Sequence, residues 1–65
     1  MLYEIVIRGY IADAWFEELT VVRKPDLDTL LRGRLADQSA LYGVLRKIND
    51  LGIDLISVNR IKEEA

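Results

Sequence analysis

Three arginines are the residues best placed for binding chemistry. Arg32 and Arg34 flank Gly33, and residues two apart on a strand share one face. Arg8 would join them if the first and third strands are neighbours. Guanidinium groups bind carboxylates and phosphates through paired hydrogen bonds. The spacing therefore allows a small-anion site of Arg8, Arg32 and Arg34. Ion pairs with Glu4, or contacts across a protein interface, would use the same side chains, and we favour these.

The acidic residues predict no metal or catalytic site. Asp26 and Asp28 could bind a divalent cation, but the further ligands of a calcium loop are missing, so a solvated turn is favoured. Glu17 and Glu18 are adjacent and diverge on a helix. The chain has no His and no Cys, which excludes a Cys/His zinc site, a cysteine nucleophile and a Ser-His pair. We expect a non-enzymatic protein without metal or cofactor.

Size and composition favour association. The chain has 65 residues, of which 51% are hydrophobic, so we expect one domain over 1–61 and a polar tail over 62–65. A domain this small buries only about 60% of its unfolded surface, and its core rarely supplies more than about 3–5 kcal/mol. We therefore expect a homo-oligomer, simplest as a dimer, or a complex with a protein partner.

Nucleic acids and membranes are not expected partners. The net charge is −2, which disfavours binding to the nucleic-acid backbone. The predicted third strand has no aromatic residue, and Tyr3 and Tyr10 of the first predicted strand point to opposite faces, so bases would find no stacking surface. The longest wholly apolar run is three residues, Ile5 to Ile7, far too short to span a bilayer. No signal peptide is apparent, which indicates a cytoplasmic protein.

The first half of the chain alternates between strand and helix patterns. Leu2–Tyr10 predicts a strand with Tyr3, Ile5 and Ile7 facing the core. A short helix follows, because the apolar residues of 12–19 recur at helical spacing. Leu19–Arg23 and Thr29–Leu35 predict two strands, and the Pro and Asp residues between them predict a turn that closes an antiparallel hairpin.

The second half carries the clearest pattern. Asp37–Leu51 predicts a helix with Asp37 as its N-cap and Gly52 just beyond its end. Its apolar stripe consists of Leu41, Val44, Leu45, Ile48 and Leu51. Ile53–Ile61 predicts the last strand.

This order predicts an α+β fold of the ferredoxin-like split βαβ plan: a four-stranded antiparallel sheet with both helices on one face. Only about eight residues are available for the first crossover, fewer than usual. The alternative is a β-meander of the first three strands, followed by the long helix and the last strand. In the split plan the other sheet face is open, and we expect an interface there. Its residues would be Val6, Arg8, Leu30, Arg32 and Arg34.

The long helix and its flanks resemble a family of small uncharacterised bacterial proteins. That family carries a G-x-L-x-D-Q-[SA]-A-L-[HY]-G-[VL]-L segment, matched by Gly33 to Leu45, and a D-L-G-[IL]-x-L-[IL]-S-V ending, matched by Asp50 to Val58. An aromatic segment like Trp15-Phe16, followed by Leu19-Thr20, is also similar. The family often has His where this chain has Tyr42. No activity comes with this resemblance, so it implies a fold and not a function.

We therefore expect a protein-interaction or self-association module. The alternative is a regulatory domain that binds a small anion or amino acid, because ACT-type domains share the split plan. Their first loop usually contains Asp-x-Pro-Gly, whereas Tyr10 to Asp13 contains neither Pro nor Gly. The alternative therefore depends on similarity of fold alone.

Overall fold

The computed structural model describes residues 1–11 and 16–62, and within them the fold is α+β, with a four-stranded antiparallel sheet and one α-helix. The strands are β1 (Leu2–Arg8), β2 (Thr20–Arg23), β3 (Asp28–Arg34) and β4 (Leu55–Ile61), and the helix is α1 (Gln38–Asp50). These lie within two residues of the predicted bounds. The predicted tail falls mostly on residues 63–65, outside the described residues.

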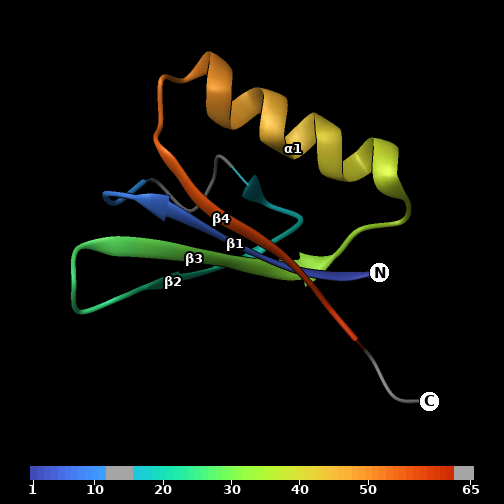
Figure 1. Cartoon of the computed structure of the whole chain (residues 1–65), viewed down its shortest axis with the longest axis horizontal. Coiled ribbons are helices and arrows are strands. Elements are labelled where there is room, and N and C mark those ends of the chain that lie inside the picture. Colours follow the sequence, from blue (N-terminus) through green and yellow to red (C-terminus); the bar gives the residue numbers. More distant parts are fainter. Residues whose placement is uncertain (12–15, 63–65) are drawn as a thin grey trace.

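The strands lie in the order β2-β3-β1-β4, and every neighbouring pair is antiparallel. Strand β1 pairs with β3 and β4, and β2 pairs with β3 (Figure 1). The alternative β-meander is therefore wrong, because it requires β1 to pair with β2. The chain crosses from β1 to the far side of β3 before it forms the β2–β3 hairpin.

The helix predicted over residues 12–19 is not found in the part of that segment that is described. Phe16–Leu19 forms a tight turn in which the Leu19 amide donates to the Phe16 carbonyl at 3.0 Å. Residues 12–15 lie outside the described residues. The apolar spacing correctly identified the buried side, because Phe16 and Leu19 are buried.

The Phe16–Leu19 turn packs directly over β3 at Gly33. A Cβ atom at Gly33 would lie 2.8 Å from Leu19 Cδ2, 3.1 Å from the Glu18 carbonyl oxygen and 3.3 Å from Leu19 Cα. Two of these three atoms belong to the backbone and cannot rotate away. Gly33 is therefore required for close approach between the turn and the sheet.

Both ends of α1 are capped as the sequence predicts. The Asp37 side chain accepts a hydrogen bond from the Ala40 amide at 2.8 Å. At the other end Gly52 has a φ of 71°, and its amide donates to the Asn49 carbonyl while the Ile53 amide donates to the Ile48 carbonyl. This is the Schellman arrangement, which satisfies carbonyls left free at the helix end.

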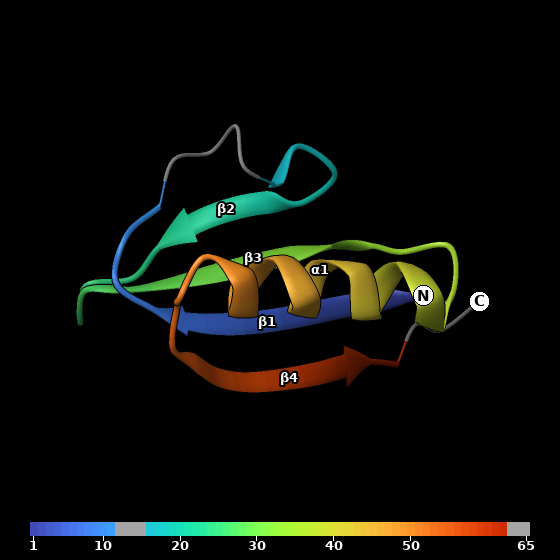
Figure 2. The same ribbon diagram turned by 90° about the horizontal axis from the view of Figure 1, so that it is seen from above.

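The core lies between α1 and one face of the sheet. Tyr3, Ile5 and Ile7 of β1 are buried, which confirms the predicted inward set. From the helix Leu41, Val44 and Ile48 are buried; Leu45 is partly buried and the C-cap Leu51 is exposed. Figure 2 shows α1 lying over the middle of the sheet, with β4 at an edge that α1 does not cover. Thus one sheet face is covered by α1 and by the Phe16–Leu19 turn.

Candidate functional site

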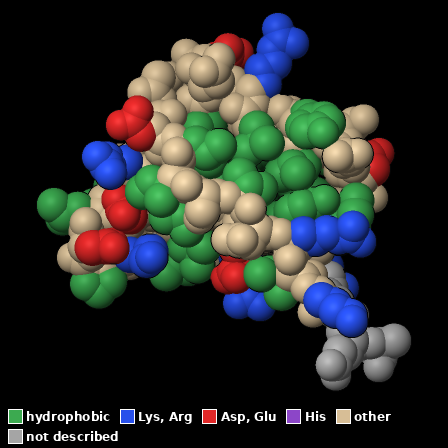
Figure 3. All heavy atoms as spheres, viewed as in Figure 1, with side chains coloured by type: hydrophobic (Ala, Val, Ile, Leu, Met, Phe, Trp, Pro, Cys, Tyr) green, Lys and Arg blue, Asp and Glu red, His purple; other side chains and the backbone are tan. Residues whose placement is uncertain are grey.

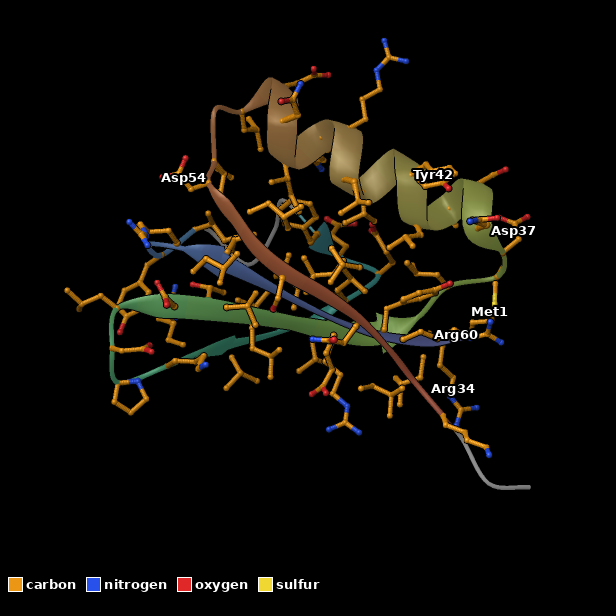
Figure 4. The ribbon with its side chains drawn as sticks, viewed as in Figure 1. Met1, Arg34, Asp37, Tyr42, Asp54 and Arg60 are labelled. Atoms are coloured by element: carbon orange, nitrogen blue, oxygen red, sulfur yellow. The ribbon has the colours of Figure 1, made fainter. Side chains whose placement is uncertain are left out.

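The other face of the sheet is covered by no described element. Residues of β1 and β3 that alternate with the buried ones point to this side, and they are half-buried or exposed. We call this surface the open face. On β1 and β3 it consists of Leu2, Glu4, Val6, Arg8, Asp28, Leu30, Arg32 and Arg34. In Figure 4 many side chains extend from the sheet on the side away from α1.

An apolar row crosses the middle of the open face. The strand register places Val22 opposite Leu30 and Leu30 opposite Val6. Val22 is 45% exposed, and the other two are half-buried. Adjacent strands lie about 4.8 Å apart, so Leu30 is the cross-strand neighbour of both Val22 and Val6. We call them the apolar row.

Four charged residues border this row in alternating order. On one side Glu4 lies opposite Arg32, and their side chains form an ion pair of 3.8 Å. On the other side Arg8 lies opposite Asp28. Along β1 the charges run negative then positive, and along β3 they run positive then negative. These four residues, which we call the charge quartet, form a checkerboard around Val6 and Leu30.

The register separates the three arginines proposed as an anion site. Arg8 lies opposite Asp28, whereas Arg32 and Arg34 lie four and six residues further along β3. At about 3.3 Å per residue, these positions are about 13 and 20 Å from Arg8. Arg32 is paired with Glu4, and Arg34 lies opposite Leu2. The register thus places Arg8 apart from Arg32 and Arg34, because the alternation of side chains gives the face of a residue but not its position along the strand.

Exposed apolar side chains that the sequence did not mark lie at two separate places. Leu55 and Ile56 at the start of β4 are 47% and 44% exposed, and Tyr42 of α1 is 58% exposed. In Figure 4 the labelled residues Tyr42 and Asp54, the latter next to Leu55, lie at opposite ends of α1. Figure 3 shows hydrophobic side chains between α1 and β4. The Tyr42 hydroxyl accepts a hydrogen bond from the Gln38 amide group at 2.9 Å. The helical pattern had placed Tyr42 off the main stripe, which was the available signal.

A shallow pocket of about 290 Å³ lies at the end of the sheet where β1 begins and β4 ends. It is lined by Met1, Leu2, Arg60, Ile61 and Lys62. Its volume is at the lower limit for small-molecule sites, about 300–1,000 Å³, and among the described residues its lining contains no carboxylate.

The described residues give no sign of a metal site or a membrane span. No group of three or more acidic, His or Cys side chains within 1–11 and 16–62 could hold a metal ion. In the same part of the chain, α1 is too short and too polar to cross a bilayer.

Comparison with known proteins gives a family without an activity. No curated protein and no solved structure matches the chain significantly. One family does match, over residues 2–59 and therefore over nearly all of the sheet and the whole helix. The chain belongs to the family described as Domain of unknown function (DUF8691).

Proposed function

We propose that this protein is a non-enzymatic self-association module, and that its open face binds a second copy. The observation that carries the proposal is the apolar row, which lies uncovered in the middle of the open face. Core packing does not require Val6, Val22 or Leu30 to be apolar, because their side chains point away from it. Threonine would suit these strand positions equally well. Apolar side chains there favour burial against a partner.

The size of the open face indicates weak association. Three strands of seven residues and the four residues of β2 make 25 residues. At about 4.8 Å between strands and about 3.3 Å per residue they give a face of about 400 Å². Two copies would bury about 800–900 Å², which is below the usual range for stable complexes, about 1,200–2,000 Å². We therefore expect a dimer with a dissociation constant of about 10 μM to 1 mM.

We further propose that the fold follows the split βαβ plan. The order β2-β3-β1-β4, with α1 connecting β3 to β4, supports this proposal. The first crossover contains residues 12–15, so the proposal for that half of the plan depends on the pairing of β1 and β2 with β3. A cytoplasmic location and a bacterial origin remain predictions from the sequence.

Sedimentation equilibrium over about 10 μM to 1 mM tests the function. The untagged protein should pass from monomer to dimer, and Val22→Lys should stay monomeric because it places a charge in the apolar row. Tyr42→Lys is the control, since Tyr42 is 58% exposed and lies on α1, on the opposite side of the sheet from the apolar row. A wild-type protein that stays monomeric throughout contradicts self-association. Loss of the dimer in Tyr42→Lys alone would place the contact on α1 instead.

A further inference from the structure

We infer that the second copy binds in one specific orientation, in which the apolar row of each copy stacks on itself and the two charge quartets pair. This inference rests on the proposed self-association and adds to it the symmetry and the paired residues. The charge pattern favours a second copy as the partner. The four alternating charges are complementary to the same four charges after a half-turn. The open face therefore has the property that a two-fold contact between identical copies requires.

The orientation follows from a two-fold axis that lies between two facing sheets and runs along the apolar row. Such an axis places β1 over β1 and β3 over β3 and reverses the strand direction. Val6 then faces Val6, Leu30 faces Leu30 and Val22 faces Val22. Facing sheets pack about 10 Å apart, a gap that side chains from both copies fill together.

The same axis pairs every charge of the quartet with an opposite charge of the second copy. Glu4 and Arg8 are equally far from Val6 along β1, so Glu4 of one copy faces Arg8 of the other. Arg32 and Asp28 are equally far from Leu30 along β3, so these two face each other as well. Each charge then has one opposite neighbour in its own sheet and one across the interface.

A second axis, parallel to the strands, would also match the charges but not the apolar row. It places β1 over β3, so Val6 faces Leu30, and it places β2 over β4. Val22 would then face Ser57, because both lie in the row of Val6 and Leu30. The first axis buries all three apolar side chains against apolar partners, and we therefore assign the dimer to it.

Charge pairs of this kind fix orientation more than they add affinity, because their desolvation offsets much of their attraction. Like charges brought together have no such compensation. A variant that turns attractive contacts into repulsive ones therefore reports the orientation, provided that it preserves the pairs within each copy.

The double variant Glu4→Arg/Arg32→Glu makes the contacts between copies repulsive. It keeps the opposite-charge pair within each copy. Under the assigned axis, however, the arginine introduced at position 4 would face Arg8 of the other copy, and the glutamate introduced at position 32 would face Asp28 of the other copy. The two-fold axis repeats both repulsive contacts, so each occurs twice in the dimer. We expect its dissociation constant to rise by about tenfold or more. Adding Arg8→Glu and Asp28→Arg restores the checkerboard with all signs inverted, and this quadruple variant should dimerise like the wild type.

Sedimentation equilibrium on the untagged chain measures all three proteins, with thermal unfolding by circular dichroism to check folding. The exchange Arg46→Asp/Asp50→Arg is the control, because it inverts an exposed ion pair on α1 away from the sheet. A double variant that dimerises normally overturns the assigned axis. A quadruple variant that stays monomeric while folded also overturns it. In both cases wild-type dimerisation leaves the proposed function standing, whereas a monomeric wild type removes the function itself.

Discussion

Replacing Gly33 by alanine tests the packing of the Phe16–Leu19 turn over β3. The new methyl group would lie 2.8 Å from Leu19 Cδ2 and 3.1 Å from the Glu18 carbonyl oxygen. Both approaches are shorter than normal van der Waals contact. Gly33 does not have a positive φ, so the backbone accepts alanine and steric overlap alone opposes it.

The magnitude follows from two opposing effects. Overpacking a tight contact costs about 1–3 kcal/mol. Alanine also restricts the unfolded chain, which stabilises the folded state by about 0.4–1 kcal/mol. We therefore expect Gly33→Ala to lower the free energy of unfolding by about 1–2 kcal/mol, a large share of the total for a domain of this size.

Urea denaturation followed by circular dichroism at 222 nm measures this change, at one fixed protein concentration so that association does not differ between variants. Gly43→Ala is the control, because a Cβ atom there meets nothing within 4 Å. In a helix interior alanine is more stable than glycine by about 0.8–1.0 kcal/mol. The two substitutions should therefore shift the urea midpoint in opposite directions. A Gly33→Ala protein as stable as the wild type would refute the reasoning.

Two further substitutions test local features by the same denaturation assay. Leu27 is 68% exposed and has a φ of 71°; since left-handed backbone is unfavourable for a branched side chain, Leu27→Asn should stabilise the protein by about 1 kcal/mol, and a loss of stability would contradict this. Thr29 is fully buried and its hydroxyl donates to the Gly9 carbonyl at 2.6 Å. Thr29→Val keeps the shape but removes that bond, so it should cost about 0.5–1.5 kcal/mol, and an unchanged midpoint would show that the bond contributes nothing.

The sequence predicts those parts of the fold that are set by local pattern. The inward set of β1 and the caps of α1 follow from alternation, from Asp37 and from Gly52, because each depends only on residues close in the chain. The sequence predicted helix where Phe16–Leu19 forms a turn that packs against Gly33, fourteen residues beyond Leu19. Local spacing gives no information about that contact.

For the candidate site, too, local pattern predicts some features, whereas others depend on contacts between residues distant in the chain. Parity alone places Val6 and Leu30 on one sheet face, and the structure has them there. The position of Arg8 depends on register, which is set by how two strands distant in the chain align. Register placed Asp28, rather than Arg32, opposite Arg8. The anion site was therefore a reasonable prediction from parity that register did not support.

Register also gives the open face its capacity for self-recognition. Had β1 and β3 been aligned two residues differently, Glu4 would lie opposite Leu30 or Arg34 and the checkerboard would be lost, although each side chain would still point to the same face. Core burial thus leaves several registers possible, and this one combines a filled core with alternating charges around an apolar row. Because shifting by two residues moves no side chain to the other face, the charge pattern is a property separate from folding. It is therefore the feature of this surface that substitution can invert without disturbing the core.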